Sequence, residues 1–332
     1  MKSAYQGGSI TYLDGTDVAA CAAAAKEADV AIIFAGTLSG EGADRKSLSL
    51  DDGISASNQN ALIEAVAAAN ADTVVVLTVP GAILTPWKAQ VKAMLTNFMP
   101  GQQCGNAITD VLLGKVNPSG KLPLTFPNVE NETEFAPSQW PGVPDAPLPT
   151  PKSDPPQACT YAAKTGYLQG FDAESAKPEG NPKCTYSNYT EKLLVGYRYY
   201  DAHKIEFTTG FPFGHGLSYT EFKYSQFSVS PKGGGAEVEV TLENTGKVAG
   251  SEVVQVYVEF PASAGEPPRQ LKGFTKETLD AGAKIDIRLT LTEHDFSIWD
   301  VATHKWAVPP GDFSVYVGTS SRDNTLAGTV HH

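Results

Sequence analysis

The first third of the chain alternates between two hydrophobic patterns. Short apolar runs predict strands at residues 30–35, 73–79 and 93–99. The first run is continuous and ends at a glycine, which is typical of a strand buried on both faces. Ala-rich or amphipathic segments predict helices at residues 17–28, 58–70 and 106–113, and Asp17 is placed to cap the first of them. Strands and helices that alternate in this way predict βαβ units and a mostly parallel sheet.

The last third has a different pattern, in which polar and apolar residues alternate. The alternation is clear at residues 237–242, 254–258, 284–289 and 313–317. Turn signals such as Asn244-Thr245-Gly246 separate these runs, and short half-buried strands at this spacing predict an antiparallel β-sandwich. The expected fold class is therefore α/β followed by all-β. We expect an α/β sandwich domain over residues 1–220 and a β-sandwich domain over residues 221–330.

Between these regions, from about residue 128 to residue 188, prolines cluster and periodicity disappears. A loop of this length within a domain is usually functional or held by crosslinks. Cys159 and Cys184 flank part of it, and a disulfide between them would contribute roughly 3 kcal/mol to stability. Free thiols are the alternative. The aromatic-rich stretch that follows, residues 195–200 and then 211–219, is expected to pack back onto the first domain.

The same polar region contains two glycosylation sequons, Asn131 (Asn-Glu-Thr) and Asn188 (Asn-Tyr-Thr). Together with the cysteine pair they favour a secreted or extracellular glycoprotein. No signal-peptide pattern follows Met1. The chain is then either a mature piece of a secreted protein or a protein that stays in the cytosol.

Composition narrows the classes of partner. The chain has 25 Lys and Arg against 37 Asp and Glu, a formal charge of −12, which disfavours nonspecific binding to nucleic acid. No apolar run reaches the length of a membrane span. The four cysteines form no CxxC pair and no histidine stands at ligand spacing from them, so neither a metal nor a cofactor is expected.

The segment with the clearest chemical potential is GTLSGEGADRKSLSL at residues 36–50. It follows the first strand, and ligands bind at the carboxyl ends of strands in parallel α/β sheets. Glu41 stands between two glycines, which allow a sharp turn and a close approach of substrate. Asp44 and Arg45 follow and are candidates to support it. The alternatives are a solvated surface charge for Glu41 and a structural clamp, bonded to Asp44 or to loop carbonyls, for Arg45.

Other common sites are excluded or disfavoured. The chain has no GxxxxGK[ST] loop, no complete dinucleotide fingerprint and no Gly-x-Ser-x-Gly elbow. His215, in Phe-Gly-His-Gly, is interpreted as a structural residue of a tight turn rather than a base. His331 and His332 are expected to be tail residues.

Blocks along the whole chain resemble the C-terminal portion of glycoside hydrolase family 3, which includes β-glucosidases and β-xylosidases. In the first domain the matching blocks are ADVAIIFAGTLSGEGADRKSLSL (28–50), NALIEAVAAANADTVVVLTVPGAILTPW (60–87), MLTNFMPGQQCGNAITDVLLGKVNPSGKLPLTFP (94–127), YTEKLLVGYRYYD (189–201) and FPFGHGLSYTEF (211–222). The last region resembles the fibronectin type III-like domain of such enzymes, with VTLENTGKVAGSEVVQVYVEFP, RQLKGF and WAVPPGDFSVYVG.

This resemblance implies a retaining glycosidase acting on a β-linked glucoside or oligosaccharide. Members usually carry the nucleophilic Asp on a (β/α)₈ barrel and the general acid/base on the α/β sandwich domain. In many members the acid/base is the Glu of a Ser-Gly-Glu-Gly loop, which corresponds to Glu41. Retaining chemistry places two carboxyl groups about 5 Å apart, and a desolvated Glu suits the proton donor.

The departure from the family is the barrel, which takes roughly 250 residues and does not precede Glu41 here. No substitute nucleophile is found. We therefore expect the chain to need a barrel partner and to be inactive alone. The alternative is a non-catalytic carbohydrate-binding or structural module of an extracellular or surface assembly. Three aromatic residues are candidates for stacking on sugar, although packing is the favoured interpretation of each: Trp87, Trp140 and Tyr199.

Overall fold

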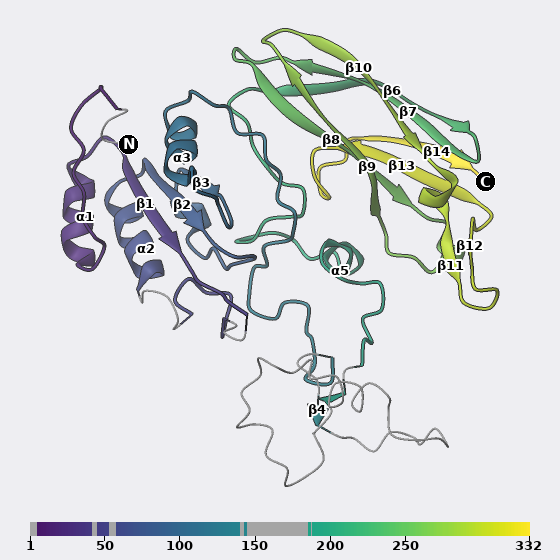
Figure 1. The fold of residues 1–332 in the computed structure, drawn as a ribbon, viewed down its shortest axis with the longest axis horizontal. Coiled ribbons are helices and arrows are strands. Elements are labelled where there is room, and N and C mark those ends of the chain that lie inside the picture. Colours follow the sequence, from purple (N-terminus) through teal and green to yellow (C-terminus); the bar gives the residue numbers. More distant parts are fainter. Residues whose placement is uncertain (1–4, 42–44, 53–57, 140–142, 145–184, 187) are drawn as a thin grey trace. The chain divides into compact units, whose positions relative to one another are not determined.

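The computed structural model describes residues 5–41, 45–52, 58–139, 143–144, 185–186 and 188–332 (Figure 1). Two compact units are found. The larger comprises Met1–Leu38, Arg45–Glu130 and Leu193–His332, and the smaller comprises Ser39–Asp44 and Asn131–Lys192. Several predicted positions lie outside the described residues: Asp44, Trp140, Cys159, Cys184 and most of the Pro-rich stretch.

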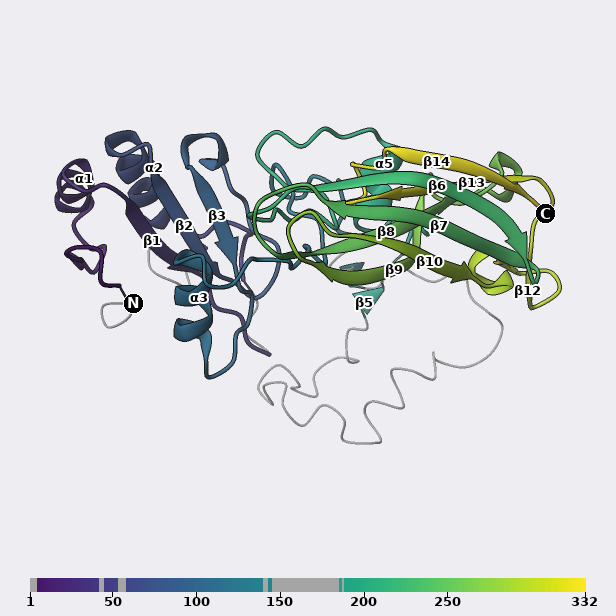
Figure 2. The same ribbon diagram turned by 90° about the horizontal axis from the view of Figure 1, so that it is seen from above.

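The α/β part of the larger unit contains a parallel three-stranded sheet in the order β1-β2-β3. Its strands are β1 (Ala31–Gly36), β2 (Thr73–Thr78) and β3 (Ala93–Thr96). Its helices are α1 (Val18–Lys26), α2 (Gln59–Ala69), the short 3₁₀ helix η1 (Lys88–Gln90) and α3 (Cys104–Leu112). Figure 2 shows α2 and α3 on opposite faces of the strands. Asp17 caps α1 as predicted, because its carboxylate accepts a 2.9 Å hydrogen bond from the Ala20 amide.

The expectation that the first strand is buried on both faces is wrong. Ile33 and Ala35 of β1 lie in the core with Trp87, but Phe34, which points to the other face, is 60% exposed. Leu38, two residues beyond the strand on that same face, is 67% exposed. Apolar composition alone does not tell whether a second layer covers a face, and at β1 none of the described residues does so.

The second part of the larger unit is an antiparallel β-sandwich, as predicted. One sheet has the order β10-β7-β6 and the other the order β14-β13-β8-β9. Their bounds are β6 (Phe222–Lys232), β7 (Gly235–Asn244), β8 (Gly250–Glu259), β9 (Gln270–Leu279), β10 (Lys284–Leu291), β13 (Asp312–Gly318) and β14 (Leu326–His331). Short 3₁₀ helices, η2 (Ala262–Ala264) and η3 (Glu293–Phe296), and a hairpin of β11 (Ile298–Asp300) and β12 (Lys305–Ala307) complete it. Inward-facing residues of both sheets form one core, among them Val240, Val256 and Phe313.

The C-terminal histidines are not a tail, which corrects the expectation for them. His331 is the last residue of β14 and its Nδ1 lies 2.7 Å from a carboxylate oxygen of Asp312. The His332 ring packs against Phe296 and Phe313, with ring centroids 4.7 and 5.2 Å apart. Both residues therefore belong to the folded sandwich.

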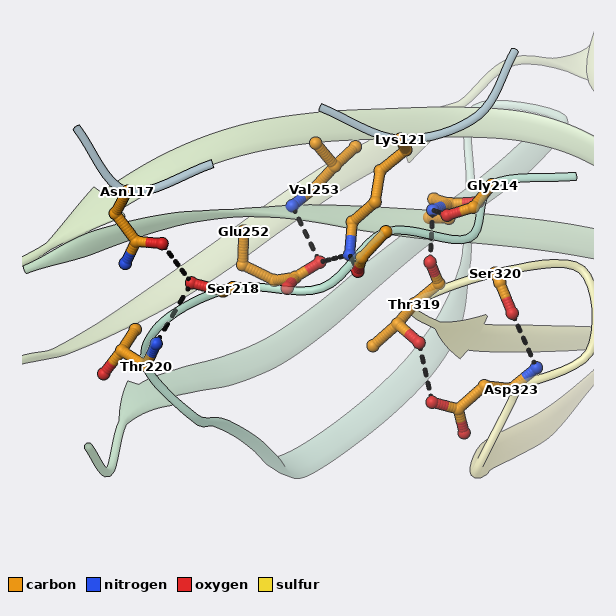
Figure 3. Close-up of polar contacts among 12 residues, drawn as sticks. Asn117, Lys121, Gly214, Ser218, Thr220, Glu252, Val253, Thr319, Ser320 and Asp323 are labelled. Atoms are coloured by element: carbon orange, nitrogen blue, oxygen red, sulfur yellow. Dashed lines mark hydrogen bonds and ion pairs between the residues drawn. The ribbon is translucent and has the colours of Figure 1, made fainter. Parts of the chain in front are cut away.

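Segments 117–126 and 211–220 connect the α/β part to strand β8 of the sandwich (Figure 3). Lys121 Nζ lies 2.8 Å from the carboxylate of Glu252, and both side chains are buried, 11% and 7% exposed. The same ammonium donates to the carbonyl of Gly216 at 2.9 Å. Gln255 of β8 donates to the carbonyl of Gly214 at 3.2 Å. Burial and the charge of Glu252 raise the pKa of the neighbouring phenol of Tyr224.

The aromatic-rich stretch packs onto the first domain only in part. Phe211 contacts Phe126 there, with centroids 6.4 Å apart. Tyr197, at the start of α5 (Tyr197–Ala202), instead meets Tyr257 of β8, with centroids 6.1 Å apart. Its hydroxyl oxygen accepts a 2.9 Å hydrogen bond from the amide of Leu271, so this end of the stretch belongs to the sandwich.

In the smaller unit, β4 (Val143–Pro144) pairs antiparallel with β5 (Thr185–Tyr186). Both sequon asparagines, Asn131 and Asn188, are exposed. The Asn131 side chain bonds to the backbone of Phe135 through both its oxygen and its nitrogen, each at 3.1 Å. Across the part of the chain that the structure describes, no helix is long and apolar enough to cross a membrane.

Candidate active site

The chain segment that carries Glu41 begins at the carboxyl end of β1. β1 pairs in parallel with β2 up to Gly36 opposite Thr78. A glycine is required there, because a Cβ atom at Gly36 would overlap the carbonyl oxygen of Thr78. The outer edge of Gly36 is occupied by the side chain of Gln59, whose amide accepts from its N–H and donates to its carbonyl, both at 2.9 Å. The last residue of the strand is thus hydrogen-bonded on its outer edge, while the amide of the next residue, Thr37, donates to the carbonyl of Thr78 on the other edge.

The segment that follows the loop returns to the first turn of α2. Asp51 accepts hydrogen bonds from the backbone amide of Gln59 at 2.6 Å and from the side-chain amide of Asn60 at 3.0 Å. Asn58, the residue at the N-cap position, makes no side-chain cap bond and has a φ of 68°. Asp51 therefore satisfies the free amides of the helix start from outside the helix, with its negative charge at the positive end of the helix dipole.

Further contacts hold the returning segment to the end of the sheet. The hydroxyl of Thr37 is hydrogen-bonded to the buried carboxylate of Asp52. Asn60 accepts from the indole N–H of Trp87 at 2.9 Å, and Trp87 is fully buried. This places Trp87 in the core and removes it as a sugar-stacking candidate.

Arg45 and Glu130 bind backbone groups of the same region. Arg45 Nη1 donates to the carbonyl of Ala82 at 2.9 Å, a loop carbonyl of the kind expected for a structural clamp. The carboxylate of Glu130 accepts from the amide of Leu48 at 2.9 and 3.2 Å. The two ends of the loop, at Thr37 and at residues 45–52, are therefore fixed in the larger unit.

Glu41 lies in a turn of the smaller unit and its side chain is exposed, like the preceding Ser39 and Gly40. Within the described ranges of the chain, Glu41 is therefore on the surface and not in a core. Among the residues that the structure describes, no three His, Cys, Asp or Glu side chains are grouped to hold a metal ion.

A separate group of basic side chains surrounds residues 210–216. Lys88 Nζ donates to the carbonyl of Gly210 at 2.7 Å and lies 4.2 Å from the ring centroid of Phe211. Burial lowers the pKa of Lys88. Burial also lowers the pKa of His215, and the charges of Lys121 and Lys88 lower it further. His215 stacks on Phe211, with centroids 5.3 Å apart, in the packing role that its sequence context predicts.

Sequence reasoning selected the loop but missed the residues that anchor it. Asp51, Gln59 and Asn60 are ordinary polar residues in the sequence, and the bond from Gly36 to Gln59 joins positions 23 residues apart. A possible signal was the pair Asp51-Asp52 shortly before a helix that opens with Gln59-Asn60, because carboxylates favour helix starts.

Two family models match the chain. The model of the "Glycosyl hydrolase family 3 C-terminal domain" matches residues 5–219, and that of the "Fibronectin type III-like domain" matches residues 252–321. The chain is 37% identical over 315 residues to "Thermostable beta-glucosidase B" of Acetivibrio thermocellus, an alignment that covers 92% of this chain and 35% of the relative.

Solved structures of β-glucosidases also match the chain over nearly its whole length. The crystal structure of DesR, a β-glucosidase from Streptomyces venezuelae in complex with D-glucose, has a TM-score of 0.77 and 34% identity, covering 95% of this chain and 35% of that one. The β-D-glucoside glucohydrolase from Trichoderma reesei has a TM-score of 0.76 and 32% identity, covering 99% of this chain and 44% of that one. The chain thus spans less than half the length of each of these three proteins.

Proposed function

From the premise that the chain belongs to glycosyl hydrolase family 3, with the family's C-terminal domain and a fibronectin type III-like domain, we propose that it is the proton-donating portion of a β-glucosidase. In this proposal Glu41 is the general acid/base and the substrate is a β-linked glucoside or oligosaccharide. The observation that carries the proposal is the position of Glu41, in an exposed turn directly after the carboxyl end of a parallel strand.

The proposed chemistry needs a second carboxyl group from another domain. In a retaining glycosidase one carboxylate attacks the anomeric carbon, and the other carboxyl group protonates the leaving oxygen at a distance of about 5 Å from the first. Glu41 would supply that proton and would then take one from the water that releases the sugar. The nucleophile would come from a (β/α)₈ barrel partner, as would the apolar surroundings that a proton donor needs.

Two observations support a partner. The relatives that carry β-glucosidase names are more than twice as long as the aligned region, since the alignments cover 35% to 44% of them. In addition, β1 and its flanks carry an exposed apolar row in the larger unit, with Val30, Phe34 and Leu38 each more than half exposed. Exposed apolar surface of this kind marks interaction sites, and we propose that the remainder of the enzyme covers it.

The experiment joins the chain to the barrel portion of the Acetivibrio thermocellus relative, in place of that protein's own C-terminal part. With a nitrophenyl β-glucoside, Glu41→Gln should lower kcat/KM by about 10²–10⁴-fold, the usual contribution of a general acid. With a dinitrophenyl glucoside, whose leaving group needs no proton, the first step should be nearly unaffected, and azide should restore turnover by replacing the base-activated water.

Glu64→Gln is the matched control, because Glu64 is an exposed glutamate on α2, and it should leave both substrates unaffected. The chain alone should hydrolyse neither. If Glu41→Gln equals the unaltered fusion on both substrates, the assignment of Glu41 is wrong. Turnover by the chain alone would contradict the need for a barrel.

Secretion and glycosylation are a separate proposal, supported by the exposure of Asn131 and Asn188. Expression in a eukaryotic secretory host, followed by enzymatic removal of N-glycans, tests it. A loss of mass that is absent from variants with Gln at both positions is expected, and an unchanged mass would contradict it.

A further inference from the structure

The hairpin of β11 and β12 (Figure 1) contains two exposed tryptophans, Trp299 and Trp306. Trp299 lies directly opposite Trp306 in the antiparallel register. The two rings are 5.7 Å apart between centroids with an interplanar angle of 70°. Ile298, on the other face of the hairpin, packs against the sandwich core. The fold thus buries one face of this short hairpin and presents the indole pair on the other.

Both indoles remain accessible. Trp299 is 48% exposed and Trp306 is 55% exposed, and the adjoining Val301 is 75% exposed. Two histidines extend the aromatic surface: the His294 ring lies 4.4 Å from Trp306 and the His304 ring 6.4 Å from Trp299, between centroids. Indole rings bring a large, rigid contact area at low entropic cost, and an exposed group of them marks a binding surface.

The charges around this pair select a neutral ligand. Asp295, next to His294 in the chain, and Asp300, on the hairpin, bring carboxylates to this region. Lys305 lies opposite Asp300 in the register, and Lys272 interacts electrostatically with Asp295. The carboxylates of Asp295 and Asp300 accept hydrogen bonds within their own turns, at 2.7 and 2.8 Å from Thr292 and at 2.9 and 2.7 Å from Ala302 and Thr303. These two carboxylates, on a chain of net charge −12, disfavour the binding of phosphates and anionic lipid surfaces.

We propose that Trp299 and Trp306 form a binding site for a neutral β-linked glucan, separate from Glu41. A β-linked glucose unit carries its hydroxyls around the rim and C–H groups on both faces, so it stacks on an indole without needing a charge. The carboxylates of Asp295 and Asp300 and the polar groups of the 300–304 turn can bind the hydroxyls at the rim of the sugar. The site holds a polymer near the enzyme without taking part in hydrolysis.

The test is binding of the full chain to a soluble mixed-linkage β-glucan by affinity electrophoresis. The double variant Trp299→Ala/Trp306→Ala should weaken retention at least about tenfold in dissociation constant. Phe274→Ala is the matched control, because Phe274 is a 66% exposed aromatic residue of the same sandwich, and it should leave retention unchanged. Glu41→Gln should leave it unchanged too.

A purely structural role for the indole pair gives a different result. The double variant would then unfold at lower temperature but, while folded, be retained like the unaltered chain, and that result would overturn the proposal. Loss of retention with Glu41→Gln alone would also overturn it, and would assign glucan binding to the site of the proposed function.

A measurement on the unaltered chain covers the case in which the double variant does not fold. Stacking of a sugar on exposed indoles shifts their fluorescence, whereas the buried Trp87 is shielded. The Trp140→Phe variant, measured in parallel, removes the fourth indole and should titrate like the unaltered chain. Titration with a β-glucan hexasaccharide should shift the emission to shorter wavelength with saturation, and Glu41→Gln should titrate alike. An unchanged spectrum at saturating oligosaccharide would refute the proposal.

Discussion

Replacing Lys121 with methionine should lower the free energy of unfolding by about 3 kcal/mol, because it leaves the buried carboxylate of Glu252 without its cation. The 2.8 Å separation of Nζ and the carboxylate oxygen corresponds to a Coulomb attraction of about 6 kcal/mol at an effective dielectric constant of about 20. Desolvation of the two charges costs several kcal/mol for each and offsets most of that attraction. The intact pair is therefore nearly neutral, and the large effect comes from breaking it.

The double-mutant cycle makes this reasoning quantitative. Glu252→Gln should also cost about 3 kcal/mol, since it leaves a buried ammonium. The double variant leaves no charge unpaired and should therefore cost less than either single variant, rather than the sum of about 6 kcal/mol. Urea unfolding followed by circular dichroism and by tryptophan fluorescence measures each free energy, and coincident transitions from the two probes show that one cooperative unit unfolds.

The matched control is Lys284→Met. Lys284 is paired with Glu243 at 3.0 Å, but its side chain is 61% exposed, so its loss should cost less than about 1 kcal/mol. Additive effects of the Lys121 and Glu252 substitutions would refute the reasoning, because they would mean that the two groups do not compensate each other. An equal cost at Lys284 would refute the role of burial.

Two further predictions concern the anchoring of the loop and its neighbourhood. Asp51→Ala should cost about 1–2 kcal/mol in urea unfolding, because α2 loses its N-terminal acceptor, and a change within error would show that Asp51 does not cap the helix. Burial and nearby lysines lower the pKa of His215 below its usual 6.5. As the pH falls, His215 is therefore protonated in the unfolded chain before it is protonated in the folded chain, and stability is lost below about pH 6.5. His215→Phe should therefore reduce the drop in urea midpoint between about pH 7.5 and about pH 5, and an undiminished drop would contradict that assignment.

Sequence periodicity predicted the strands with clean alternation and missed those without it. β6 contains a register shift between Ser225 and Ser228, with Gln226 at a φ of 50°, and the bulge breaks the period of two. β9 places Phe274 outward, 66% exposed, so its apolar residues do not share one face. β14 includes Gly328, which has no side chain to contribute to an alternating pattern. The alternating pattern therefore predicted the sandwich. It did not predict β6, β9 and β14, because their form depends on tertiary packing.

The candidate site was predictable in its position but not in its anchoring. A glutamate between glycines after an apolar strand can be identified from the sequence, because strand ends are where ligands bind. The bonds of Gln59 and Asp51 cannot, because they depend on how β1 and α2 lie together. The Trp299–Trp306 pair was missed for the same reason: only the hairpin register brings these positions opposite each other.

The blocks that carry the family resemblance have different physical roles. In FPFGHGLSYTEF (211–222), a Cβ atom at Gly214 or Gly216 would overlap Gln255 or the carbonyl of Gly120. Carbonyls in and next to this block accept from Lys88, Lys121 and Gln255, side chains that come from both parts of the larger unit. Its sequence is thus explained by packing between those parts, with no need of a catalytic role. The block 28–50 differs, because its two ends are fixed while Glu41 between them is exposed, and packing does not account for an exposed glutamate between glycines. The proposed chemistry therefore depends on this block alone.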